Sequence, residues 1–72
     1  MDDSTKTIIN VILDMLQSAL KETNTVVGIM INKTDFNKSK LAFINYDSFV
    51  KGDLKDGFTV SLDELNKGII NQ

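Results

Sequence analysis

The sequence predicts a single small α+β domain in two layers: an N-terminal helix, a three-stranded antiparallel meander and a short C-terminal helix (α-β-β-β-α). Three observations predict this fold class. Apolar residues recur with helical spacing over the first twenty residues, β-branched residues concentrate in the middle, and short polar breaks separate the segments. A chain of 72 residues has room for one core, so residues 1–72 are expected to form one domain.

The first helix is expected from about Thr5 to Glu22, with Ser4 or Asp3 as its N-cap. A step of about 100° per residue places its apolar side chains on an arc of roughly 200°, whereas a surface helix needs a stripe of little more than 100°. This helix has more apolar surface than one sheet face can cover, so another element or protein must pack on its flank. The arc consists of Ile8, Ile9, Val11, Ile12, Leu13, Met15, Leu16, Ala19 and Leu20.

Three strands are expected after the polar break at residues 23–25. They cover Val26 to Asn32, Lys40 to Val50 and Phe58 to Val60. The connections between them are short and rich in Asn, Asp, Lys and Gly, which favours an antiparallel meander.

The final helix is expected to begin after Ser61. Glu64 follows Ser61 by three residues, which is the spacing of a capping box. Gly68 weakens this helix by up to about 1 kcal/mol relative to alanine. Its apolar side carries Leu62, Leu65, Ile69 and Ile70.

Both faces of the predicted sheet are apolar over the first two strands, whereas a sheet with one wet face alternates apolar and polar residues. Val27, Ile29 and Ile31 point one way and Val26 and Met30 the other; Leu41 and Phe43 oppose Ala42, Ile44 and Tyr46. Two short helices can cover one face. The other face must therefore be covered by a second copy, be docked on a partner, or remain as a large exposed patch.

The composition removes most of the side chains on which chemistry depends, because the chain has no His, Cys, Arg, Trp or Pro. Disulfides are impossible, and neither a metal site nor a cofactor is expected. Most carboxylates occupy turn or cap positions. Asp47 is the exception, since it falls in the second predicted strand, and it leaves a carboxylate-based enzyme as a remote alternative. The chain is otherwise expected not to be an enzyme.

The charges argue against nucleic-acid and membrane partners. The net charge is −2, and five of the eight lysines fall in two groups, residues 33–40 and 51–55, that a meander places at opposite ends of the sheet. Asp2 and Asp3 replace the positive start of a signal peptide, and polar residues interrupt the apolar run that follows. Together with the absence of cysteine, these features lead us to expect a cytoplasmic protein.

Phe36 is the strongest single candidate for binding, because it lies in a polar loop where no periodicity places an aromatic residue. The alternative is that it folds back as a plug over the end of the sheet. The full set of candidate residues for a partner or oligomer interface is Val11, Met15, Met30, Phe36, Ile44 and Tyr46.

The sequence therefore predicts a noncatalytic protein-binding domain. Its size and helix–sheet–helix layout are similar to those of many small phage or mobile-element proteins that inhibit a host factor, anti-CRISPR proteins among them. So is its amino-acid composition, which is typical of proteins from AT-rich genomes. No motif carries that likeness. We expect the chain to block a larger bacterial protein, such as a defence-system protein, by steric occlusion. The alternative is a self-assembling structural homodimer or higher oligomer.

Overall fold

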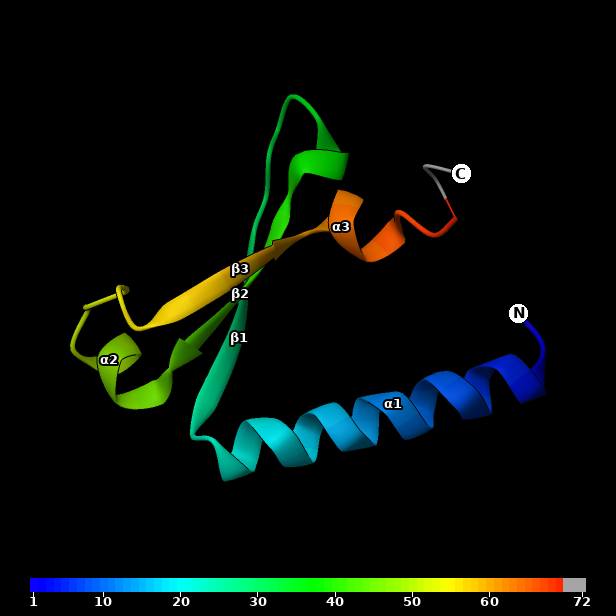
Figure 1. The fold of residues 1–72 in the computed structure, drawn as a ribbon, viewed down its shortest axis with the longest axis horizontal. Helices are drawn as coiled ribbons and strands as arrows, with labels where there is room; N and C mark the ends of the chain where they lie inside the picture. Colours follow the sequence, from blue (N-terminus) through cyan, green and yellow to red (C-terminus); the bar gives the residue numbers. More distant parts are fainter. Residues whose placement is uncertain (70–72) are drawn as a thin grey trace.

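The computed structural model describes residues 1–69 and confirms the predicted fold class. One antiparallel sheet has the strand order β1-β2-β3, and helices precede, interrupt and follow it (Figure 1). The elements are α1 Asp3–Glu22, β1 Thr25–Met30, the 3-10 helix η1 Phe36–Lys38, β2 Lys40–Asn45, α2 Tyr46–Val50, β3 Gly57–Ser61 and α3 Leu62–Asn66.

Helix α1 begins earlier than the sequence predicts, because its N-cap is Asp2 and not Ser4 or Asp3. The Asp2 carboxylate accepts a hydrogen bond of 2.7 Å from the backbone amide of Thr5. Hydrogen bonds from the backbone and side chain of Thr5 lower the pKa of the Asp2 carboxyl, which keeps a negative charge at the positive end of the helix dipole.

The strand register separates the sheet into two faces. Val27 lies opposite Phe43, and Phe43 lies opposite Phe58, so these three residues share a face. We call this the inner face; its apolar members are Val27, Ile29, Leu41, Phe43, Phe58 and Val60. The outer face carries Val26, Gly28, Met30, Ala42, Ile44 and Thr59. The predicted alternation is confirmed within the strands.

The prediction of a second strand reaching Val50 is wrong. The strand ends at Asn45, whose side chain accepts a 3.1 Å hydrogen bond from the amide of Ser48 and caps α2. Tyr46 and Asp47 therefore lie on a helical turn and not in a strand. The first strand also ends early, at Met30, so Ile31 belongs to the loop.

The C-terminal helix has the predicted start. The hydroxyl of Ser61 accepts a 3.1 Å hydrogen bond from the amide of Glu64. The helix is short and ends at Asn66, two residues before Gly68, so Ile69 follows it. Ile70 lies outside the described residues.

The fold is open, with very little core. Ala42 is the one apolar residue of the described chain that is buried, at 6% exposure, and α1 contains no buried residue. The chain exposes 6031 Å², whereas a compact monomer of its mass exposes about 4,450 Å², a surplus of about 1,600 Å². The radius of gyration is 14.4 Å against about 11 Å for a compact domain of this length.

The open shape arises because α1 leaves the sheet at the start of β1 and extends away from it (Figure 1). Two arms result, which we call the V: α1 forms one arm, and the sheet with α3 forms the other. The contact between α1 and the sheet is made mainly with β1. Neither arm is covered by the other, which is why the apolar side chains of both stay exposed.

Gly57 and Gly28 offer a matched test of the sheet. A Cβ on Gly57 would lie 2.5 Å from the carbonyl oxygen of Phe43, whereas a Cβ on Gly28 meets nothing within 4 Å. We expect Gly57→Ala to lower the free energy of unfolding by about 1–3 kcal/mol because backbone must shift. Gly28→Ala is expected to be neutral or stabilising by up to about 1 kcal/mol. Urea unfolding at one fixed protein concentration measures both, and equal effects would contradict the described register.

Candidate functional site

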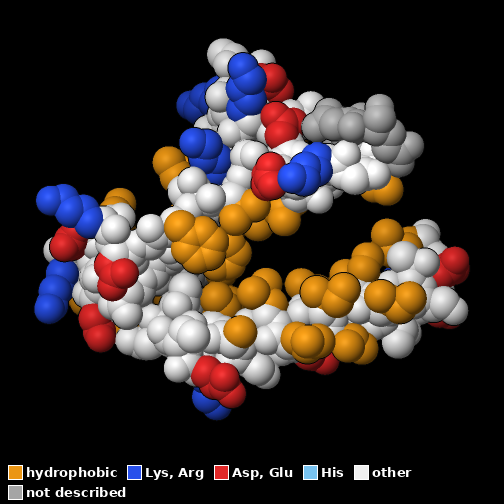
Figure 2. Space-filling view, in the orientation of Figure 1, with side chains coloured by type: hydrophobic (Ala, Val, Ile, Leu, Met, Phe, Trp, Pro, Cys, Tyr) orange, Lys and Arg blue, Asp and Glu red, His pale blue; other side chains and the backbone are white. Residues whose placement is uncertain are grey.

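Apolar side chains line the inside of both arms of the V (Figure 2). On α1, the large apolar side chains from Ile8 to Leu16 range from 39% exposed for Leu16 to 67% for Met15. Monomeric proteins seldom expose contiguous apolar patches of more than a few hundred Å². The V is thus the largest feature of this molecule that requires a functional explanation.

The inner face carries an exposed aromatic pair. The rings of Phe43 and Phe58 stack with their centroids 5.1 Å apart and their planes 17° apart. Phe58 is nevertheless 64% exposed. A stacked pair presents a flat and rigid apolar surface, which is the kind of surface that anchors protein interfaces.

The vertex of the V lies where α1 meets the sheet. A shallow hollow there is lined by Thr23 from the end of α1 and by inner-face residues that include Thr25, Phe43 and Phe58. Inner-face residues thus lie at the vertex, where a second hollow is lined by Leu20, Val26 and Tyr46. The outer face has its own hollow, lined in part by Met30, Ile44 and Leu54.

The junction between α1 and β1 is fixed by hydrogen bonds. The hydroxyl and amide of Thr23 both donate to the carbonyl of Ala19, at 2.7 and 3.0 Å. Asn24 adopts a left-handed conformation with φ 53°, and its carbonyl accepts a 2.8 Å bond from the amide of Tyr46. Its side-chain amide donates to a carboxylate oxygen of Asp47 at 3.3 Å. These bonds tie the end of α1 to the start of α2.

The loop between β1 and β2 is also tightly built. Ser39 is fully buried; its hydroxyl accepts a 2.9 Å bond from the amide of Asn32, and its carbonyl accepts a 2.9 Å bond from the amide of Leu62. The side-chain oxygen of Asn32 in turn accepts from the amides of Thr34 and Asp35, both at 3.0 Å. The loop is therefore closed by its own hydrogen bonds and anchored to the start of α3.

Phe36 stands on this anchored loop and is 62% exposed. It begins the short helix η1, which Asp35 caps by accepting a 3.1 Å bond from the amide of Asn37. The exposure does not fit a plug over the end of the sheet. An exposed aromatic ring on a backbone held by several hydrogen bonds needs little ordering when it binds.

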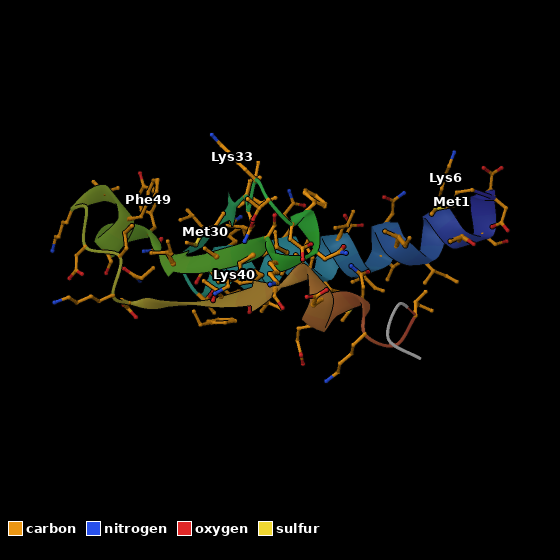
Figure 3. All side chains as sticks on the ribbon, turned by 90° about the horizontal axis from the view of Figure 1, so that it is seen from above. Met1, Lys6, Met30, Lys33, Lys40 and Phe49 are labelled. Carbon is orange, nitrogen blue, oxygen red and sulfur yellow. The ribbon has the colours of Figure 1, made fainter. Side chains whose placement is uncertain are left out.

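The six predicted interface residues do not form one patch. Val11 and Met15 lie on α1, Met30 and Ile44 on the outer face, Phe36 on the loop and Tyr46 at the start of α2. All are exposed except Ile44, which is half-buried. Figure 3 shows how far apart these regions are, since Met1 and Lys6 at the free end of α1 lie far from Met30 and Phe49. The sequence did not single out Phe43 and Phe58, because only the register places them together.

The carboxylates have mostly structural roles. Asp47, the candidate for chemistry, lies in the first turn of α2 and accepts the bond from Asn24. Within residues 1–69, no group of three or more His, Cys, Asp or Glu side chains could hold a metal ion. No described helix is both long enough and apolar enough to cross a membrane.

Comparisons with family models, with curated proteins and with solved structures give no match to this chain.

Asn24 tests the junction. Because its backbone is left-handed, Asn24→Ala is expected to cost about 1–2 kcal/mol of folding free energy, while Asn24→Gly tolerates the conformation and costs less. Both variants lose the bond to Asp47, so their difference isolates the backbone term. Urea unfolding gives the two values. A glycine variant less stable than the alanine variant would show that the conformation of residue 24 is not what holds the junction.

Proposed function

We propose that this chain is a noncatalytic protein-binding unit, most concretely a small phage- or mobile-element-type inhibitor that blocks a larger bacterial protein by steric occlusion. The observation that carries the proposal is the uncovered apolar surface. A chain that exposes about 1,600 Å² beyond a compact monomer has enough surface for a specific protein interface, which takes about 800 Å² from each partner.

Phe36 supports the inhibitor form of this proposal. Interface hot spots are enriched in rigid aromatic residues, and Phe36 combines 62% exposure with an anchored backbone. Lys33 and Lys38 flank it in sequence and give the loop a positive rim. A partner surface with an apolar pocket and acidic surroundings would suit this loop, since rim charges contribute to the rate and specificity of association.

The source suggested by the proposal rests on composition. The chain uses lysine at all eight basic positions and is rich in Ile and Asn, as expected from an AT-rich genome. Steric occlusion suits such a chain, because a small protein with one rigid aromatic anchor can block a larger protein without catalysing a reaction. A cytoplasmic location would follow if the target is a bacterial defence protein.

Phe36→Ala tests the proposal, with Phe49→Ala as the matched control. Phe49 is also an exposed phenylalanine, at 52%, but it lies on α2 at the other end of the sheet. The wild-type chain, immobilised, is used to capture proteins from a bacterial lysate, and each captured protein is then purified and titrated. We expect Phe36→Ala to weaken the specific complex by about 30-fold, the loss of one hot spot, and Phe49→Ala to leave it unchanged.

Two results would contradict this proposal. One is a purified complex whose affinity responds equally to the two substitutions. The other is the failure of any captured protein to bind after purification, while the chain itself remains folded.

A further inference from the structure

The apolar surfaces inside the V fit a partner with two matching apolar surfaces. Among residues 1–69, one arm is an amphipathic helix without a buried residue, and the other is an apolar sheet face that no described helix covers. What each arm lacks is what the other arm of the same chain supplies. Two copies related by a two-fold axis can therefore satisfy both arms at once, because such an interface uses the same surface on both subunits.

The chain cannot satisfy the two arms by itself. Closing α1 onto its own inner face would change the direction of the chain at residues 23–24. That change would require another backbone conformation at Asn24, whose φ is 53°. In the structure α1 points away from its own inner face, which a second molecule can reach.

The dimensions agree with this arrangement. Helix α1 has 20 residues and is about 30 Å long. The strands have five or six residues, so the inner face is about 17–20 Å along the strands, and α3 continues beyond β3. A helix of the length of α1 can thus cross the inner face and reach the exposed side chains of Leu65 and Ile69.

The distribution of charges also allows α1 to dock on the inner face. None of its strand positions carries a charge; the polar ones are Thr25 and Asn45. Four charged residues of α1 lie on the arc opposite its apolar side chains: Asp3, Lys6, Asp14 and Lys21. Glu22, the last residue of the helix, falls at the edge of the apolar arc. A helix docked by the middle of its apolar arc would leave the four opposite charges in water.

The area points to a stable dimer. If each copy buries its surplus of about 1,600 Å², the total is about 3,200 Å², within the range of about 2,000–5,000 Å² for obligate homodimers.

We propose that a second copy of this chain closes the V, with α1 of each protomer lying on the inner face and α3 of the other. The proposal rests on the proposed function in one respect, since both take the uncovered apolar surface to be a protein-binding surface. The exchanged dimer would bury Phe43, Phe58, Ile12 and Met15, and it would leave the Phe36 loop of each protomer available to a target.

The experiment measures the solution mass by light scattering over a wide concentration range, together with the radius of gyration by X-ray scattering. The wild type is expected at twice the chain mass of 8.0 kDa. Ile12→Asp, at the centre of the apolar arc, should raise the dimer dissociation constant at least about 100-fold, because each dimer loses two buried isoleucines. The control Gln17→Asp adds the same charge on the polar arc and should change the dimer dissociation constant by less than about threefold.

A cross-linking experiment tests the arrangement itself and does not depend on how well Ile12→Asp folds. The chain has no cysteine. Chains carrying Ile12→Cys are mixed with chains carrying Ile29→Cys and treated with a short bifunctional thiol reagent. The expected product joins one chain of each kind, whereas Gln17→Cys with Ile29→Cys should give none. A dimer without the first product would overturn the exchange of α1.

The monomeric outcomes separate this proposal from the proposed function. A wild-type monomer that keeps a radius of gyration near 14.4 Å at every concentration would overturn the dimer and leave the protein-binding function standing. A monomer near 11 Å would mean that α1 closes on its own sheet. That result would overturn both proposals, because no uncovered surface would remain.

Discussion

The direction in which α1 leaves the sheet determines the shape of this molecule. At the junction Asn24 has a left-handed conformation, and hydrogen bonds join it to the start of α2. The sheet is otherwise an ordinary antiparallel meander, and α1 is an ordinary capped helix. The junction between them converts two elements that would form a two-layer core into two separate apolar arms. The small core, the large exposed area and the proposed binding role all follow from that direction.

The proposed dimer would add stability to a chain with a small core. Domains of this size bury a modest share of their surface, and those without disulfides or metals commonly depend on association. This chain has no cysteine, and its core is small even for its length. The rigid parts, the junction and the loop anchored by Ser39, serve to hold apolar surface in place. That is the organisation expected of a subunit whose folding and binding are coupled, because the partner supplies the missing half of the core.

The sequence was a good guide to the elements and a poor guide to their arrangement. The helical spacing of α1, the β-branched strands and the Ser61 cap are local signals, and they were predicted. The helix α2 was missed because its aromatic and apolar residues fit a strand as well as a helical turn, and the Asn45 cap decides between them. The pairing of Phe43 with Phe58 depends on register. The direction in which α1 leaves the sheet is not indicated by the apolar pattern that predicts the helix.

The proposed dimer places α1 of one copy on the inner face of another. The most direct test is an isotope-filtered NMR experiment on a mixture of labelled and unlabelled wild-type chains, which detects contacts between copies only. Exchange of α1 predicts contacts from the methyl groups of Ile12 and Met15 in one chain to the ring protons of Phe43 and Phe58 in the other. Contacts between these groups within a single chain, with none between copies, would contradict it.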